Sequence, residues 1–301
     1  MNTSRLVLGT AQLGMRYGVA NTSGRPSSRD ARILVEAAWK AGIRHFDTAQ
    51  GYGDSEAVLG DCLSSIGGQA DARIVTKLSP HLDYLQPGTL EASAKESLKR
   101  LGVPRLAALL LHDENLLGGW ESGFRPTLTA LSTAGLADGG GASLYTPERA
   151  LQAIALPGCA AIQIPANVFD HRFESHGVFE AAKRQGVKIY VRSVFLQGVL
   201  LLDPDQLPPG LSMAREPLAR FRRVCQRLNV TPRAAALGYI RERHPEALVL
   251  FGAEAADQVR QNLADWNTRF PGVVSALESA FSEPLPEALL NPSLWPKQGS
   301  N

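Results

Sequence analysis

The chain has few cysteines: Cys62, Cys159 and Cys225 are the three among its 301 residues, and they lie far apart. Three separated thiols suit neither a disulfide framework nor a metal knuckle, in which cysteines recur at short spacings. Free thiols in a reducing cytoplasm are the simpler interpretation. We therefore expect a cytoplasmic protein without disulfides and without a metal site.

Long apolar runs and a strong charge of one sign are also missing. No run of about 18 apolar residues occurs, so no membrane span is expected. The start, MNTSRLVLGT, lacks a charged segment followed by a long apolar one, which argues against a secretory signal. The 31 basic and 29 acidic residues nearly cancel, and no basic stretch is interleaved with aromatic residues. We expect neither nucleic acid nor a membrane as a partner.

What the sequence contains is an alternation of short apolar runs with longer helix-like segments. Several of the runs are continuously apolar, as are strands buried on both faces of a parallel sheet. The fifth run, LADGGGAS, has glycines where apolar residues are expected, so we predict an irregular fifth strand. The runs that predict strands are residues 5–10, 43–47, 72–77, 106–111, 136–143, 160–164, 187–192 and 247–251.

Helical patterns fill the segments between these runs. Leu34, Ala38 and Ala41 share one face of a predicted helix, which ends at Gly42. Residues 90–101 show the same pattern, and that helix ends at Gly102. Eight strand–helix units predict a closed (β/α)8 TIM barrel, with residues 1–301 as a single domain. An open doubly wound sheet is the alternative. Its usual GxGxxG turn is replaced here by GTAQLG, which favours the barrel.

Two segments depart from this repeat. Residues 198–210, GVLLLDPDQLPPG, predict a long Pro-rich loop after the seventh strand, and loops of this length are often functional. After about residue 283, four prolines and Trp295 predict a tail that lies as a loop over or beside the barrel.

Four chemically suited residues stand at or just past the ends of the second, third and fourth predicted strands: Asp47, Tyr52, Lys77 and His112. The carboxyl ends of barrel strands share one rim, so these side chains should converge. A lone tyrosine has a pKa of about 10, which a nearby ammonium lowers. A carboxylate keeps the ammonium charged, and an imidazole can position a carbonyl oxygen. This set predicts a general acid for carbonyl reduction, whose hydride must come from a cofactor.

Each of the four residues has a structural alternative when it is taken alone. Asp47 could cap a turn, and Tyr52 could be an aromatic residue of the rim. Lys77 could pair with a neighbouring acid, and His112 could be a hydrogen-bonded structural histidine. Their coincidence at three successive strand ends favours the catalytic interpretation.

The segments DTAQGYGDSEAVLG, VTKLS and LLLH, in this order and spacing, resemble the aldo-keto reductase superfamily. The resemblance runs from GTAQLG to QVRQNL, and it implies an NAD(P)H-dependent oxidoreductase that reduces an aldehyde or ketone to an alcohol. Tyr52 would be the general acid, and Lys77 would lower its pKa. Asp47 would hold Lys77, and His112 would orient the substrate carbonyl. NADPH is the implied cofactor, NADH is possible, and the partner is a small-molecule carbonyl compound.

The resemblance also implies which residues contact the cofactor. Thr10 lies at the end of the first strand, while Ser143 and Gln163 match residues that bind the nicotinamide carboxamide. Arg192 stands where many members place an aromatic ring on the nicotinamide, and a guanidinium plane can also stack. Further candidates are Ser193, Leu196 and Gly198 along the pyrophosphate and Gly252, Gln258 and Asn262 at the adenosine end.

The adenosine end departs from the family pattern. Many members carry Lys or Arg near the 2′-phosphate of the adenosine ribose, but the matched positions here are Gly252, Ala253 and Gln258. Arg260 is the nearest cation in the sequence. The local support for NADPH is therefore weaker than is usual in the family.

The substrate would enter among the loops of the rim. Scattered aromatic residues more often pack in a core, but six of them are candidates for the pocket: Tyr17, Tyr84, Trp120, Phe124, Phe195 and Trp295. Two other functions stay open. One is a cofactor-binding regulatory or accessory protein with little turnover. The other is a Schiff-base lyase that uses Lys77, although Asp47 suits a charged lysine better than a free amine.

Overall fold

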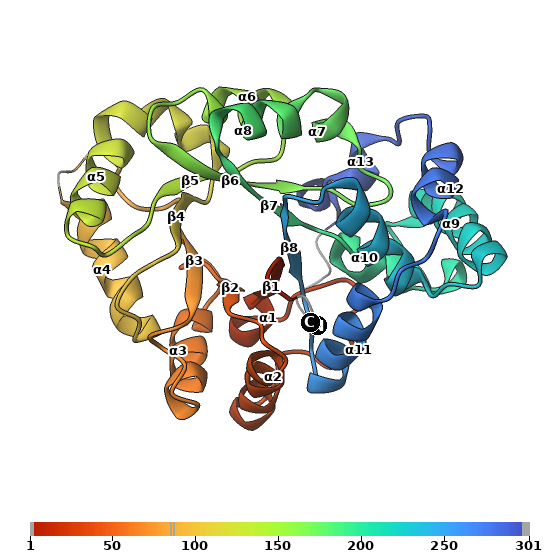
Figure 1. Ribbon diagram of the computed structural model, residues 1–301, viewed down its shortest axis with the longest axis horizontal. Helices are drawn as coiled ribbons and strands as arrows, with labels where there is room; N and C mark the ends of the chain where they lie inside the picture. Colours follow the sequence, from red (N-terminus) through yellow and green to blue (C-terminus); the bar gives the residue numbers. More distant parts are fainter. Residues whose placement is uncertain (1–2, 85, 87, 297–301) are drawn as a thin grey trace.

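The eight strands close into a parallel barrel in the computed structural model, which describes residues 3–84, 86 and 88–296 (Figure 1). Each strand pairs with its neighbours in sequence, and β8 pairs with β1. The predicted (β/α)8 barrel is therefore confirmed. The strands are β1 (Leu6–Gly9), β2 (His45–Asp47), β3 (Arg73–Leu78), β4 (Ala108–Leu111), β5 (Gly140–Ser143), β6 (Cys159–Pro165), β7 (Lys188–Arg192) and β8 (Leu248–Phe251).

The helices surround the barrel as an outer ring (Figure 1). They are α1 (Ala11–Gly14), α2 (Ser28–Lys40), α3 (Ser55–Ser65), α4 (Thr89–Leu101), α5 (Arg125–Thr133), α6 (Pro147–Ile154), α7 (Arg172–Ser175), α8 (Val178–Gln185), α9 (Arg215–Leu228), α10 (Pro232–Arg243), α11 (Ala256–Asn267), α12 (Val273–Ala280) and α13 (Glu287–Leu290). Short 3-10 helices are η1 (Glu114–Gly119), η3 (Leu196–Leu201), η4 (Pro204–Gln206), η5 (Ser212–Ala214) and η6 (Pro292–Leu294), and η2 (Trp120–Phe124) is a π-helical turn.

Local signals in the sequence explain where the helices begin and end. The Ser27 hydroxyl accepts a hydrogen bond from the Asp30 amide, and so caps α2. At the end of α4, Gly102 adopts a left-handed conformation with φ of 63°, which glycine reaches at little cost. The helices predicted at these two places are confirmed.

The core has two parts that follow from strand alternation. Val7, Val75, Leu110 and Leu250 form a small apolar cluster with their neighbours inside the barrel. The alternate strand residues pack against the helices in a much larger cluster. Successive side chains of a strand point to opposite faces. Lys77, two residues beyond Val75, therefore points to the barrel interior at its carboxyl end.

The fifth strand is irregular, as predicted. Its pairing with β6 shifts register between Gly140 and Gly141. A Cβ atom on Gly141 would overlap the backbone carbonyl oxygen of Ala161 on β6. The glycine therefore permits a close approach of the two backbones that no side chain would allow.

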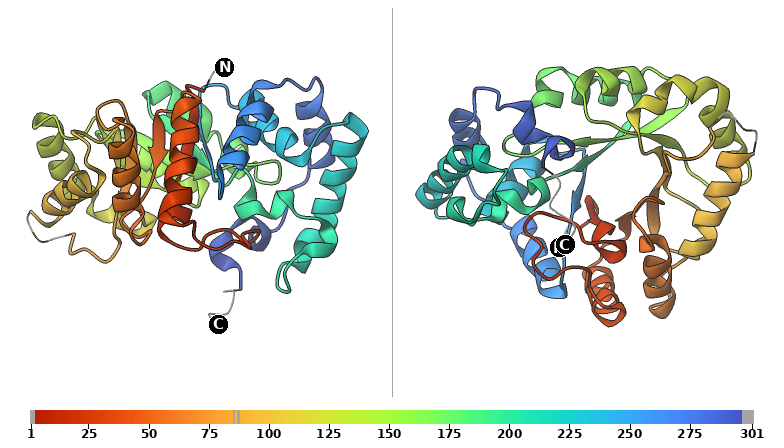
Figure 2. Two further views of the ribbon diagram at one scale, coloured as in Figure 1. Left: turned by 90° about the horizontal axis from the view of Figure 1, so that it is seen from below. Right: turned by 180° about the vertical axis from the view of Figure 1, so that it is seen from behind.

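The segment after β7 and the tail pack against each other at one end of the barrel (Figure 2). The predicted Pro-rich loop, residues 198–210, contains the end of η3 and the whole of η4, and η5 follows it. The tail contains α13 and η6, with residues 297–301 outside the described part of the chain. A Cβ atom on Gly210 would lie 2.8 Å from Pro296, and the Trp295 indole donates to the carbonyl of Ala288 at 3.0 Å. The end of the tail thus lies against the loop that follows β7.

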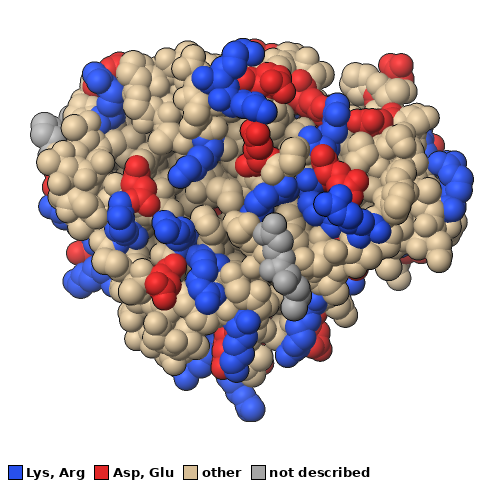
Figure 3. All heavy atoms as spheres, viewed as in Figure 1, with Lys and Arg blue, Asp and Glu red and all other residues tan. Residues whose placement is uncertain are grey.

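The surface carries both signs of charge. Basic and acidic side chains are interspersed over the face of the molecule shown in Figure 3. Among the described helices, none is long and apolar enough to cross a membrane. Cys62, Cys159 and Cys225 are free thiols, and Cys62 and Cys225 are buried.

Candidate active site

A buried ion pair lies at the carboxyl ends of β2 and β3. The Lys77 ammonium donates to the two carboxylate oxygens of Asp47 at 2.7 and 2.8 Å and to the carbonyl of Thr48 at 2.9 Å. The Gln163 side-chain amide donates to Asp47 Oδ2 at 2.7 Å. The side chains of Lys77 and Asp47 expose only 1% and 5% of their surface. Such a pair is tolerated away from water because each charge is met by hydrogen bonds.

The rings of Tyr52 and His112 stand beside this pair. Their centroids are 5.5 Å apart in an edge-to-face arrangement, and Lys77 Nζ lies 5.0 Å from the Tyr52 ring centroid. The structure therefore brings the acid, the phenol, the amine and the imidazole together on one rim. This is the arrangement expected from the strand ends.

The phenol of Tyr52 keeps its proton at neutral pH. Burial, and then the carboxylate charge of Asp47, raise the pKa of Tyr52, while Arg192 acts weakly in the opposite direction. The net shift is opposite to the lowering expected from Lys77. The reason is first that burial takes the phenol out of water, and second that the carboxylate charge of Asp47 opposes the nearby ammonium. Tyr52 is thus a protonated donor at neutral pH.

The imidazole of His112 is neutral. Burial, Lys77 and Arg192 lower the pKa of His112 to about 4, and Asp113 only partly opposes them. Its Nδ1 atom is buried and has no hydrogen-bond partner among the described residues. A neutral ring with a free nitrogen can hydrogen-bond a ligand oxygen when it carries its proton on the side that faces the ligand.

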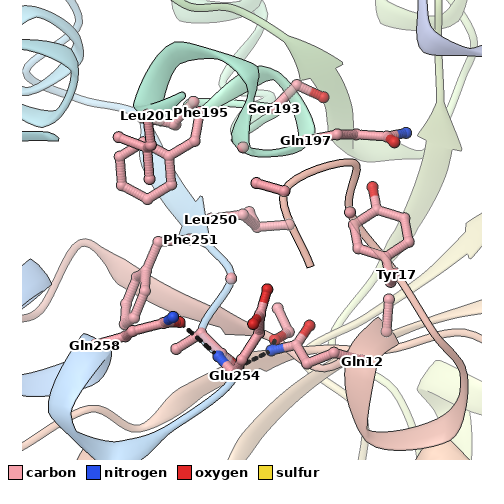
Figure 4. A pocket seen from close by; sticks show the side chains of 18 of the residues that line it. Gln12, Tyr17, Ser193, Phe195, Gln197, Leu201, Leu250, Phe251, Glu254 and Gln258 are labelled. Atoms are coloured by element: carbon pink, nitrogen blue, oxygen red, sulfur yellow. Dashed lines mark hydrogen bonds between the residues drawn. The ribbon is translucent and has the colours of Figure 1, made fainter. Parts of the chain in front are cut away.

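A cavity of about 490 Å³ lies beside the ion pair, and part of its lining is shown in Figure 4. It is bounded by Asp47 and Tyr52 at one end and by the loop between β8 and α11 at the other. Eight of the ten predicted cofactor contacts line it: Thr10, Gln163, Arg192, Ser193, Gly198, Gly252, Gln258 and Asn262. The other two, Leu196 and Ser143, are buried and do not line the cavity, so they stay predictions.

The segment after β7 follows the cavity with an unusual backbone. Ser193, Leu196 and Gln197 have φ values of 62°, 48° and 53°, and Gly198 has φ of 93°. Left-handed conformations at non-glycine residues are costly and cluster at ligand sites. A Cβ atom on Gly198 would lie 2.6 Å from that of Ala20, so this loop is held closely against the loop after α1.

Arg192 presents its guanidinium plane to an aromatic ring. The Arg192 Cζ atom lies 4.2 Å from the centroid of Tyr145, and Nη2 donates to the carbonyl of Leu144 at 3.2 Å. Tyr145 was not among the predicted residues. Its only signal in the sequence is its position two residues after Ser143, at the end of β5. Of the two, Arg192 lines the cavity, and it brings a positive charge near Tyr52.

The far end of the cavity offers uncharged polar groups. The Asn262 amide group donates to the carbonyl of Gly252 at 3.4 Å, while its Oδ1 atom is buried without a partner among the described residues. The Gln258 side-chain oxygen accepts from the Glu254 amide at 2.7 Å. A buried acceptor without a partner calls for a donor on a bound molecule. Together with the left-handed segment after β7, it fits a long polar cofactor.

Comparison with known proteins identifies the family. The model of the aldo/keto reductase family matches residues 5–276. The chain belongs to this family. It is 26% identical to pyridoxal 4-dehydrogenase of Microbacterium luteolum, over 90% of this chain and 92% of that protein. It is 23% identical to the NADH-specific methylglyoxal reductase of Escherichia coli K12, over 94% and 95% of the two chains.

The fold of this aldo-keto reductase also has solved counterparts. A glycerol dehydrogenase from Gluconobacter oxydans superposes with a TM-score of 0.72 over 94% of each chain, at 21% sequence identity. At that identity the likeness concerns the fold alone. The named relatives are dehydrogenases and reductases, so this family member is an oxidoreductase.

The aromatic candidates for the pocket divide into two groups. Tyr17 and Phe195 line the cavity. Tyr17 exposes 41% of its surface to solvent. The predictions for Trp120 and Phe124 were wrong, since these side chains expose 1% and 0% of their surface in the core.

The two remaining aromatic candidates do not line the cavity and stay predictions. The Tyr84 hydroxyl donates to the carbonyl of Ser79 at 3.1 Å, and Trp295 packs within the tail. Neither side chain lines the cavity. Residues that do line it but were not predicted include Gln12, whose amide donates to the carbonyl of Ala253 at 2.6 Å, and Glu254.

Proposed function

We propose that this aldo-keto reductase uses a reduced nicotinamide cofactor to convert an aldehyde or ketone into an alcohol, with Tyr52 as the general acid. The observation that carries the proposal is the meeting of Asp47, Tyr52, Lys77 and His112 on one rim, where Asp47 and Tyr52 line a long polar cavity. The cofactor supplies the hydride when it is bound. The protein supplies the proton.

The proton comes from the phenol of Tyr52. A general acid in hydrogen-bond reach of the reacting oxygen contributes roughly 10²–10⁴-fold in rate. The raised pKa keeps this proton in place at neutral pH. An alkoxide is a stronger base than a phenolate, so the oxygen of the reduced carbonyl still takes the proton. The raised pKa of Tyr52 therefore suits reduction.

The other three residues prepare this donor. Asp47 holds the Lys77 ammonium by two hydrogen bonds, and the ammonium lies below the Tyr52 ring. As the phenol loses its proton, the nearby positive charge stabilises the phenolate that forms. His112, neutral and with Nδ1 unpartnered, orients the carbonyl oxygen toward Tyr52.

The cofactor would lie along the cavity. Gln163 and Arg192 would hold its nicotinamide end, Ser193 and Gly198 its pyrophosphate, and Gln258 with Asn262 its adenosine end. The family resemblance favours NADPH, with NADH as the alternative. The three free thiols favour the reducing cytoplasm as the compartment.

The substrate is a small carbonyl compound that reaches Tyr52 through the rim loops. The names of the relatives suggest pyridoxal and methylglyoxal as the first compounds of a test panel. Tyr17 lines the cavity on one side, and Phe195 and Leu201 line it on the opposite side, near Phe251 (Figure 4). An aromatic ring such as that of Tyr17 can pack against an apolar or aromatic body beside the carbonyl group.

The proposal is tested by titrating NADPH and NADH into the protein, followed by a panel of carbonyl compounds. Binding of a reduced dinucleotide and its carbonyl-dependent oxidation are the expected results. Tight dinucleotide binding with no turnover on any carbonyl would instead favour the regulatory role. Absence of binding for both dinucleotides would contradict the proposal as a whole.

A further inference from the structure

The charged groups of the cavity are unevenly distributed. Four charged side chains line it among the described residues: Asp47, Arg192, Arg233 and Glu254. Asp47 is neutralised by Lys77, and Arg233 is neutralised by Asp265 through a 2.6 Å bond from Nε. An uncompensated cation, Arg192, therefore remains near Tyr52, and an uncompensated carboxylate, Glu254, remains at the far end.

Glu254 belongs to the loop that joins β8 to α11. Its side chain rises from the floor of the pocket toward the open centre (Figure 4), and its backbone amide is held by the Gln258 side chain at 2.7 Å. No ion pair or hydrogen bond engages its carboxylate within residues 3–84, 86 and 88–296. Burial raises the pKa of Glu254, as expected for a carboxylate that faces a cavity.

No cation at this end is free to neutralise a further anion, as far as the described residues show. Arg260, the nearest arginine in the sequence, is paired with Asp257 and does not line the cavity. Arg233 is committed by Nε to Asp265 and by Nη1 to the side-chain oxygen of Gln261 at 2.7 Å. A phosphate placed here would meet the carboxylate of Glu254 without a dedicated cation.

A carboxylate beside the adenosine ribose discriminates between NADH and NADPH, which differ by the 2′-phosphate of that ribose. A carboxylate accepts hydrogen bonds from the 2′- and 3′-hydroxyl groups of an adenosine ribose, whereas a 2′-phosphate needs a cation. The nicotinamide must reach Tyr52, so the adenosine half of the cofactor falls at the end of the cavity where Glu254 stands. This step rests on the proposed function.

We infer that Glu254 makes this protein select NADH over NADPH, by binding the ribose hydroxyls and repelling the 2′-phosphate. The inference reverses the NADPH expectation drawn from the family resemblance. It assigns to Glu254 a role in specificity, with no part in the proton transfer at Tyr52.

The test is equilibrium binding, which needs no substrate. In the wild type, NADH is expected to bind at least about tenfold more tightly than NADPH, because a like charge within a few ångströms costs at least that much. The fragments 5′-AMP and 2′,5′-ADP should follow the same order. Glu254→Gln should shrink the NADH preference by roughly tenfold, chiefly by tightening NADPH.

Two controls separate this effect from a change in overall charge. Glu180, an exposed acid on α8, does not line the cavity, so Glu180→Gln should leave the preference unchanged. Added salt screens the repulsion, so it should reduce the NADH preference of the wild type and have little effect on that of Glu254→Gln.

The outcomes are distinguishable from failure of the proposed function. NADPH binding as tightly as NADH to the wild type, or an unchanged preference in Glu254→Gln, would overturn the inference and leave the reductase proposal standing. Failure of both dinucleotides to bind would overturn the proposed function and this inference with it. The comparison of NADH and NADPH affinities in the wild type can overturn the inference by itself, so the test does not depend on the folding of a variant.

Discussion

The Lys77 ammonium and the Asp47 carboxylate depend on each other for their stability in the interior. Asp47→Asn keeps the shape of the side chain but leaves a buried ammonium without its counter-charge. We expect this change to lower the free energy of unfolding by about 3–5 kcal/mol. Urea unfolding followed by tryptophan fluorescence measures the difference.

The control for this prediction is the double variant Asp47→Asn with Lys77→Met. Removing both charges should restore much of the stability that Asp47→Asn loses, because no uncompensated charge then remains. An Asp47→Asn protein as stable as the wild type would contradict the ion pair described here.

The neutral state of His112 predicts the acid side of the pH profile. With its pKa lowered to about 4, His112 becomes protonated only well below neutral pH. The kcat/KM for reduction should therefore stay level through neutral pH and fall as pH approaches 4. On the alkaline side, the raised pKa of Tyr52 should preserve activity up to its ordinary value of 10.0. Steady-state rates at constant ionic strength would measure both limbs; a decline centred near pH 6.5 would contradict the shift.

At the level of elements, the eight strands and their polar ends were predictable, whereas the direction of loop side chains was not. A buried parallel strand is continuously apolar, so a charged residue at its end, such as Lys77, stands out in the sequence. Trp120 gives no such signal. Its indole donates to the carbonyl of Pro157 at 3.0 Å, a partner 37 positions away that only the fold supplies.

The glycines of β5 predicted that this strand is irregular, but they did not show why. The sequence indicated an irregular strand, but the cause lies in the contact of Gly141 with the backbone of β6. Gly141→Ala should destabilise the barrel by about 3 kcal/mol or more, since the overlap is with backbone that cannot rotate away. Gly118→Ala is the control, because nothing lies within 4 Å of its added Cβ atom. Equal thermal stability of the two variants would contradict the close approach of β5 and β6.

At the scale of the whole molecule, two histidines with lowered pKa values predict sensitivity to acid. The pKa is lowered to about 4 in His112 and to about 3 in His244, whose ring stacks on Phe179. In the unfolded chain these histidines have their ordinary pKa of 6.5, so they bind protons as the pH falls below that value. In the folded protein they bind protons only at lower pH, so acid favours the unfolded chain. Stability should therefore be steady above pH 6.5 and fall from there toward pH 3.

Melting temperatures measured across this pH range test the prediction. His244→Asn removes one of the two groups, so its melting temperature should depend less steeply on pH than that of the wild type. Equal slopes would show that the acid sensitivity arises elsewhere.

The cavity forms when the barrel closes, so only part of its lining could be predicted from the sequence. Most predicted cofactor contacts line it, because they lie at strand ends or just beyond and closure brings these ends together. Glu254 was not predicted, since its importance depends on pairings between other helices. The bond between Arg233 and Asp265 joins α10 to α11, and without it the charge of Arg233 would offset that of Glu254.

The central claim is that Tyr52 donates the proton for carbonyl reduction while other groups hold the cofactor. The most direct test is Tyr52→Phe, which keeps the ring and removes the hydroxyl, with turnover on the best carbonyl and dinucleotide affinity measured on the same preparation. The account predicts a loss of roughly 10²–10⁴-fold in kcat with little change in dinucleotide affinity. Turnover equal to the wild type would contradict it.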